Sequence, residues 1–164
     1  MQAWQPFSVL AIVKICRFTC KIFKKMTTKT FNIRAYGLLI SKKNEVLISR
    51  EMVKGNLITK FPGGGLEFGE GLSECLIREF KEELDVDIQI ISHFYTTDFF
   101  QQSAFMKTDQ LISIYYEVDL KNKLLYDKID TSDTIGFFWK DLNGLSPDDL
   151  TFPIDKIIVQ LLLK

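Results

Sequence analysis

Residues 63–86 read GGGLEFGEGLSECLIREFKEELDV, a glycine-rich segment followed by alternating apolar and charged residues. The glycines permit backbone conformations and close approaches that other residues forbid. Beyond them, apolar residues recur every four positions and predict a helix with one buried stripe, at Leu72, Leu76, Phe80 and Leu84. Gly71 suits the N-cap of this helix, and Glu74 is placed to bind free backbone N–H groups of its first turn. The stretch therefore predicts a loop that leads directly into a helix.

Carboxylates gather on one side of the predicted helix. Glu79, Glu82 and Glu83 are three and four residues apart, so their side chains project in the same direction. Three carboxylates this close repel one another unless a cation lies among them, and oxygen ligands suit a hard cation such as Mg²⁺ or Mn²⁺. Arg78 can pair with Glu82 one turn later, and Glu70 can bring a fourth carboxylate from just before the helix. A glutamate-rich helix face alone is more often solvated surface, but the adjacent glycine loop favours a metal site that handles phosphates.

The spacing of these residues also carries a family resemblance. Gly64, Glu70 and the run REFKEE at residues 78–83 resemble the Nudix box, the signature of the Nudix hydrolase family. The resemblance extends to Val86, with one departure: Asp85 stands where the family has a glycine. That glycine ends the helix in a left-handed conformation, which Asp tolerates better than most residues. We therefore expect a small structural cost and no loss of activity.

The resemblance implies the Nudix fold, an α/β/α sandwich with a mixed β-sheet. The rest of the chain is compatible with it, because strands are predicted before and after the central helix, at residues 31–40, 45–49, 56–61, 86–100, 110–120 and 134–140. Pro153 suits the first turn of a terminal helix. We expect one Nudix hydrolase domain over residues 26–164.

The same resemblance implies an enzyme that cuts a pyrophosphate bond in a nucleoside diphosphate derivative, with Mg²⁺ or Mn²⁺ as its cofactor. It assigns metal binding to four carboxylates, Glu79, Glu83, Glu82 and Glu70. It assigns catalytic roles to Glu79, Arg78 and Glu82, and backbone contacts around the metal and diphosphate to Gly63 and Gly64. The general base stays open between Glu79 in the box and two residues of later loops, Asp98 and Asp109.

Charge is unevenly distributed along the 164 residues, although the formal net charge is zero. Residues 1–29 contain six basic and no acidic residues, which leaves fifteen basic and twenty-one acidic residues at positions 30–164. The mildly acidic body argues against a nucleic-acid polymer as a partner. Residues 1–25 combine basic residues with a short apolar run that cannot span a bilayer. We expect them to lie outside the fold as an extension, and a helix lying on a membrane surface is the alternative.

Three cysteines without a nearby histidine indicate reduced thiols in the cytoplasm.

Several single residues have a structural and a functional interpretation. His93, in an apolar strand, is expected to be a structural residue. Arg34 and Arg50 are expected to be ordinary strand charges, with contact to substrate phosphates as the alternative. Three phenylalanines are expected to fill the core, with a wall for a nucleobase as the alternative: Phe99, Phe100 and Phe105.

The substrate is expected to be a small nucleotide, either a nucleoside triphosphate or a nucleotide sugar, because motifs typical of other Nudix subgroups are missing. A nucleotide-sensing module that has lost catalysis is the alternative function, but such a module would be expected to have lost box carboxylates, and these are intact. Nothing in the sequence excludes a homodimer.

Overall fold

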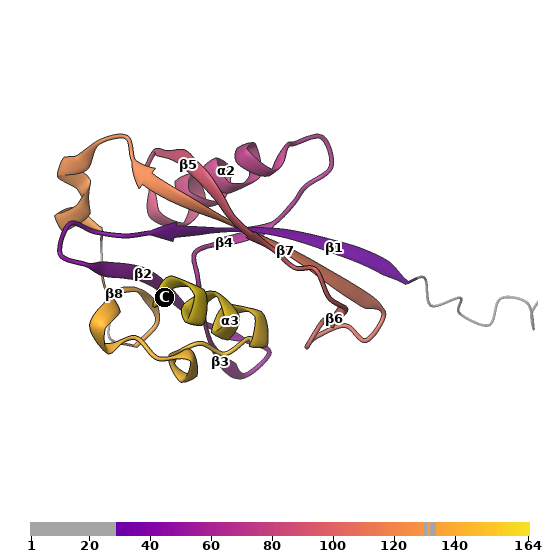
Figure 1. Cartoon of the computed structure of the whole chain (residues 1–164). Helices are drawn as coiled ribbons and strands as arrows, with labels where there is room; N and C mark the ends of the chain where they lie inside the picture. The colour runs from indigo at the N-terminus through magenta and orange to yellow at the C-terminus, as the bar shows by residue number, and fades with distance from the viewer. Residues whose placement is uncertain (1–28, 130, 132–133) are drawn as a thin grey trace, which may run out of the picture.

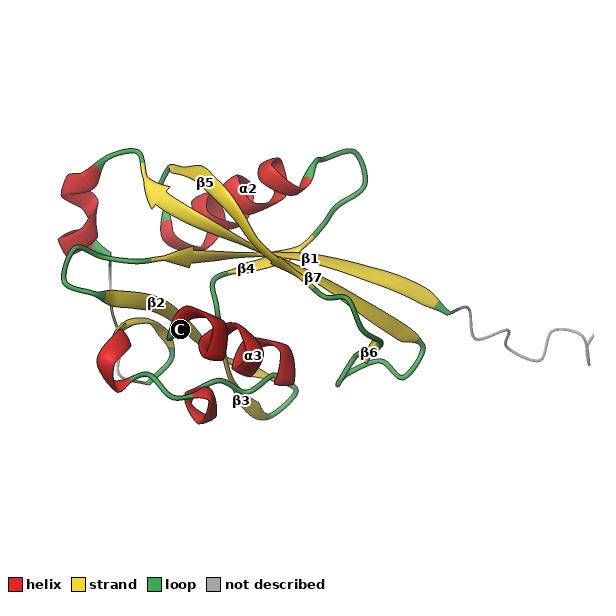
Figure 2. Cartoon of the chain, in the orientation of Figure 1, coloured by secondary structure: helices red, strands yellow, loops and turns green. Residues whose placement is uncertain are grey.

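The computed structural model describes residues 29–129, 131 and 134–164. Figures 1 and 2 show these residues as two sheets, with one long helix beside each. The strands are β1 (Thr30–Leu39), β2 (Glu45–Val53), β3 (Asn56–Lys60), β4 (Gly63–Gly65), β5 (Ile88–Thr96), β6 (Gln101–Gln102), β7 (Asp109–Leu120) and β8 (Gly136–Asp141). The helices are α2 (Leu72–Leu84) and α3 (Pro153–Leu162), with 3₁₀ segments η1 (Lys123–Lys128), η2 (Leu142–Gly144) and η3 (Pro147–Asp149).

The larger sheet is mixed, as the sequence predicted. Its order is β4-β1-β7-β5, with β6 paired to β7. Strands β1 and β7 are parallel, whereas the other pairs in this sheet are antiparallel. The smaller sheet, β3-β2-β8, is antiparallel throughout. The prediction of one mixed sheet thus holds for the larger sheet, and the remaining three strands form a second one.

Strand β1 separates two apolar cores because its side chains alternate between two faces. Ala35 contributes to the core under α2, which includes Leu76 and Phe80, whereas Tyr36 contributes to the core under α3. Helix α2 approaches β1 closely at Gly37, where an added Cβ would lie 2.6 Å from the Phe80 ring. Helix α2 therefore covers one face of the sheet, and the side of α2 that carries Glu79 lies against the glycine segment β4.

Some sequence-based expectations need correction. The strand predicted at 86–100 ends at Thr96, so Phe99 and Phe100 lie beyond it. Their side chains are exposed, at 42% and 70%, and the prediction that they fill the core was wrong. Phe105 is half-buried against Phe152, with ring centroids 6.2 Å apart.

Predictions about the first 25 residues lie outside the described residues, and so do Cys16 and Cys20. Within the part of the chain that the structure describes, no helix has the length and apolar character needed to cross a membrane.

Candidate active site

The predicted ends of the carboxylate helix are confirmed. The backbone N–H of Gly71 donates to the Glu74 carboxylate at 2.7 Å, which closes the capping box. At the other end Asp85 adopts the left-handed conformation, with φ 52° and ψ 34°. Its side chain also pairs with Lys81 one turn earlier, at 2.7 Å. Asp85 therefore takes over the backbone role of the glycine that usually occupies this position.

The glycine segment β4 lies between β1 and α2 and brings backbone against the carboxylates. Gly63 has φ +129°, and an added Cβ would lie 2.2 Å from the Ala35 carbonyl oxygen, so only glycine fits there. At Gly64 an added Cβ would lie 2.1 Å from Oε1 of Glu79. The absence of a side chain at Gly64 thus leaves the space in which the Glu79 carboxylate is held, and the Glu79 side chain is only 14% exposed.

Arg78 organises the carboxylates around it. Its guanidinium binds both oxygens of Glu70, through Nε at 3.0 Å and Nη2 at 2.8 Å, in the two-pronged geometry that is strongest for this pair. Nη1 contacts Glu79 and Glu82, each at 3.2 Å. Nη2 also donates to the Gly65 carbonyl oxygen at 3.2 Å, which ties the helix to the glycine segment. The expected contact with Glu82 is present, but Glu70 is the principal partner of Arg78.

This pairing has an electrostatic consequence for Glu70. Hydrogen bonds from Arg78, together with the backbone N–H of Glu67, lower the pKa of Glu70 to about 2. Interactions with Glu70 and Glu79 raise the pKa of Arg78. Glu70 is therefore a carboxylate whose two oxygens are already hydrogen-bonded, so its predicted role as a metal ligand stays a prediction.

Glu83 lies in a different environment on the same helix. Burial raises the pKa of Glu83, the negative charges of Glu79 and Glu51 raise it further, and the positive charge of Lys60 opposes them. A backbone hydrogen bond at Gly63 also favours the ionised form of Glu83. A buried carboxylate with two like-charged neighbours is stabilised by an added cation.

Sequence reasoning missed Lys60 and Glu51. The Lys60 side chain is 6% exposed, and its ammonium group donates to the Gly63 carbonyl oxygen at 3.1 Å and pairs with Glu51 at 3.1 Å. It thereby joins β3 and β2 to the glycine segment. The sequence gives one weak sign, since Lys60 lies only three residues before Gly63, but a lysine in a strand is ordinarily exposed.

The donor chemistry of the site fits a hard divalent cation. Across residues 29–129, 131 and 134–164, no three His, Cys, Asp or Glu side chains are already gathered as a metal-binding group. However, Glu79 and Glu83 are carboxylates that repel each other, and both lie against the backbone of the glycine segment. Oxygen donors of this kind suit Mg²⁺ or Mn²⁺, and the assignment of Glu79, Glu83 and Glu82 as ligands stays a prediction.

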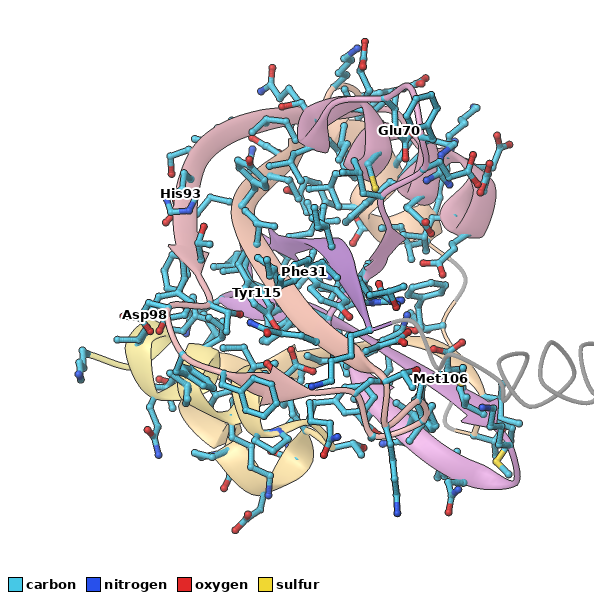
Figure 3. All side chains as sticks on the ribbon, turned by 90° about the vertical axis from the view of Figure 1, so that its right-hand side faces the viewer. Phe31, Glu70, His93, Asp98, Met106 and Tyr115 are labelled. Carbon is cyan, nitrogen blue, oxygen red and sulfur yellow. The ribbon has the colours of Figure 1, made fainter. Side chains whose placement is uncertain are left out.

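A groove of about 560 Å³ opens beside Glu79, along the edge of β1. Gly65 and Arg34 line it together with Asp109, which accepts a hydrogen bond from Thr30 at 2.8 Å. Asp98, the other loop candidate for the general base, accepts from Tyr95 at 2.9 Å and does not line this groove. Figure 3 shows Asp98 on the far side of the molecule from Glu70. The structure thus brings Asp109, but not Asp98, to the groove of Glu79.

The structure places Arg34, Arg50 and His93 in three different environments. Arg34 donates through Nε to the Tyr36 hydroxyl at 2.7 Å and lines the groove of Glu79, so it is more than an ordinary strand charge. Arg50 lies over the Phe138 ring, 4.4 Å from its centroid. His93 is exposed, bonds Thr96 at 2.8 Å and does not line the groove of Glu79, and Figure 3 shows it away from Glu70; its structural role stays a prediction.

A second polar cluster is buried under α3. Tyr115 donates to Oδ1 of Asp155 at 2.6 Å and stacks on Tyr36, with ring centroids 5.1 Å apart. Burial raises the pKa of Asp155 to about 7 and that of Tyr36 to about 12. The Tyr36–Arg34 hydrogen bond links this cluster to the groove. Asp155 was not anticipated, because an aspartate in the first turn of a helix is ordinarily an exposed cap.

Comparisons with known proteins place this geometry in context. The NUDIX domain model matches residues 31–161. An mRNA-decapping protein of fowlpox virus is 25% identical over 162 residues, which covers 93% of this chain and 68% of that protein. The 8-oxo-dGTP diphosphatase of Escherichia coli is 34% identical over 62 residues, 37% of this chain and 48% of the enzyme, so the alignment spans about half of that relative. The structure of a Nudix hydrolase from Nitrosomonas europaea superposes with a TM-score of 0.62 at 14% identity, covering 79% of this chain and 86% of that one.

Proposed function

The chain belongs to the Nudix family and is a Nudix-type pyrophosphohydrolase, and we propose that it cleaves a pyrophosphate bond in a nucleoside triphosphate or a nucleotide sugar. The observation that carries the proposal is the contact of the Glu79 carboxylate with the side-chain-free backbone of Gly64. At this contact the candidate metal ligand Glu79 lies next to both the glycine segment and the groove. A solvated helix face would not require glycine at position 64.

Nudix hydrolases generally use a divalent metal, and we propose Mg²⁺ or Mn²⁺ here, held by Glu79 and Glu83 with Glu82 and Glu70 as further candidates. Such an ion, when bound, supplies a water of lowered pKa and neutralises charge on the phosphoryl oxygens. The chain's own part is to hold the carboxylates in position. Arg78 does this through Glu70, Glu79 and Glu82 at once.

The groove supplies the groups that would orient a diphosphate. Arg34 presents a guanidinium beside Gly65, where it would pair with phosphate oxygens. The backbone of Gly63 and Gly64 can approach the same oxygens without a side chain in the way. For the general base, the groove favours Asp109 over Asp98 among the loop residues, and Glu79 is the candidate within the box.

The relatives bear different names. The fowlpox virus relative, matched over 93% of this chain, is an mRNA-decapping protein, but the two 8-oxo-dGTP diphosphatases match at higher identity, 34% and 35% against 25%. The Escherichia coli relative is a diphosphatase of 8-oxo-dGTP, a nucleoside triphosphate. We therefore favour a nucleoside triphosphate over a nucleotide sugar. We further propose that residues 26–164 form the catalytic domain and that it acts in the cytoplasm.

The test is Glu83→Gln, which keeps the size of the side chain and removes its charge. We expect the melting temperature to stay near that of the wild type, since burial disfavours the charge that the variant removes. We expect turnover of nucleoside triphosphates to fall at least about a hundredfold. Unchanged turnover by a folded variant would show that the metal site is misassigned. If the wild type binds nucleotides but hydrolyses none, the sensing module replaces the enzyme.

A further inference from the structure

Among the residues that the structure describes, one face of the larger sheet is only partly covered. Helix α2 lies over the middle of that face, whereas the first residues of β1 and β7 extend past it together with β6 (Figure 1). Phe31, near the start of β1, is 70% exposed, and Phe100, just before β6, is also 70% exposed. Exposed aromatic side chains that gather at one pocket mark a surface that can bind a ligand.

The two rings line one pocket on this face of the sheet. Phe31 is paired with Gln110 on β7, and Gln110 is paired with Gln102 on β6. Paired residues in a sheet point to the same side, so Phe31, Gln110 and Gln102 share a face. Phe100 lies just before β6, outside the strand, and lines a pocket of about 260 Å³ together with these three residues.

This pocket continues the groove of Glu79. The groove and the pocket share Thr30, Phe31 and Asp109 as lining residues. Phe31 and Arg34 are three positions apart along β1, which places the Phe31 backbone about 10 Å from the residue that pairs with the glycine segment. In Figure 3 Phe31 lies between Glu70 above and Met106 below. A substrate with its diphosphate beside Glu79 would thus extend toward Phe31.

The charges around the pocket favour a negatively charged ligand. Lys29 and Lys107 line it, against one acidic residue, Asp109. Residues 1–28, which precede this end of β1, contain five basic residues and no acid, so they do not complement these lysines. A nucleotide complements both features of the pocket, because its flat base can stack on the phenylalanines and its phosphates can pair with the lysines.

We propose that Phe31 and Phe100 form the platform on which the nucleobase of the substrate stacks, with Lys29 and Lys107 at its rim. This inference rests on the proposed function and adds the residues that recognise the base. Stacking tolerates any base, since every base presents a flat aromatic face. The platform therefore selects nucleotides over base-free pyrophosphates without choosing among the bases.

The experiment compares Phe31→Ala, Phe31→Tyr and Phe31→Leu in the full chain. Each is assayed on a nucleoside triphosphate and on a base-free substrate, phosphoribosyl pyrophosphate. We expect Phe31→Ala to raise KM for the nucleotide about tenfold or more and to leave KM for the base-free substrate unchanged. Phe31→Tyr should behave as the wild type, whereas Phe31→Leu, apolar but not aromatic, should resemble Phe31→Ala. Leu57→Ala, which removes an exposed side chain from β3 in the other sheet, is the matched control.

Several outcomes would overturn the platform. One is an equal change of KM for both substrates, and another is full activity of Phe31→Leu. A lowered melting temperature of Phe31→Ala with unchanged KM would mean that another part of the chain covers this face. If the wild type hydrolyses nothing, the proposed function fails by itself. The platform is then tested by the melting-temperature shift that a nucleoside monophosphate produces, which Phe31→Ala should lose and Phe31→Tyr should keep.

Discussion

Substituting Gly64 by alanine tests how closely the loop and Glu79 depend on each other. The added Cβ would lie 2.1 Å from Oε1, 2.2 Å from Cδ and 2.4 Å from Oε2 of Glu79. Ordinary contacts at such a Cβ begin near 3.4 Å, so the carboxylate must move by more than about 1 Å. Gly64 does not have a positive φ, so the backbone itself accepts alanine. Glu79 is a flexible side chain and can move, which means that the fold should survive.

A misplacement of about 1 Å at a reacting centre can cost about a hundredfold in rate. We expect Gly64→Ala to lower kcat by about that factor, measured as initial rates of phosphate release at saturating metal, with a melting temperature near that of the wild type. Gly65→Ala is the matched control in the same strand, since its Cβ would meet only Nη1 of Arg34 at 3.8 Å. Wild-type kcat in Gly64→Ala, or an equal loss in both variants, would refute the reasoning.

Three further variants probe the groups around this contact. Arg78→Lys cannot bind both oxygens of Glu70, so we expect kcat to fall at least about tenfold at unchanged nucleotide affinity; full activity would rule out a positioning role. Lys60→Met removes the hydrogen bond to Gly63 and should lower the free energy of unfolding by about 1–3 kcal/mol in urea titrations; a variant as stable as the wild type contradicts this. The pKa of Asp155 is raised in the folded state. The stability that protonated Asp155 contributes is therefore fully present below about pH 4 and is lost as the pH rises through about 7. The wild type should therefore lose up to about 4 kcal/mol over that range relative to Asp155→Asn, and parallel pH profiles would refute the assignment.

The parts of the structure that follow from local sequence were predictable. The capping of α2 by Gly71 and Glu74, and its left-handed end at Asp85, depend on residues a few positions apart. The pairing of Arg78 with Glu82 one turn later follows from helix periodicity alone. The glycine segment was recognised as a loop, but its pairing with β1 as the short strand β4 was not, because three glycines carry no strand pattern.

The parts that depend on distant contacts were not predictable. Lys60 reads as a surface lysine, and only the approach of β3 to the glycine segment buries its ammonium group. Asp155 reads as a helix cap, and only the packing of α3 on Tyr115 makes it a buried acid. Phe99 and Phe100 read as core residues because apolarity in sequence does not reveal where a covering helix ends. Burial is a property of the assembled sheet and helices.

The most direct measurement of the central claim is the release of phosphate or pyrophosphate from a panel of substrates by the full chain. The panel contains nucleoside triphosphates, nucleotide sugars, ADP-ribose and dinucleotides, each with Mg²⁺, with Mn²⁺ and with EDTA. We predict hydrolysis of nucleoside triphosphates that EDTA abolishes and either cation restores, and that Glu83→Gln lacks. Hydrolysis that persists in EDTA, or no hydrolysis of any substrate by protein whose melting temperature a nucleotide raises, would contradict the account.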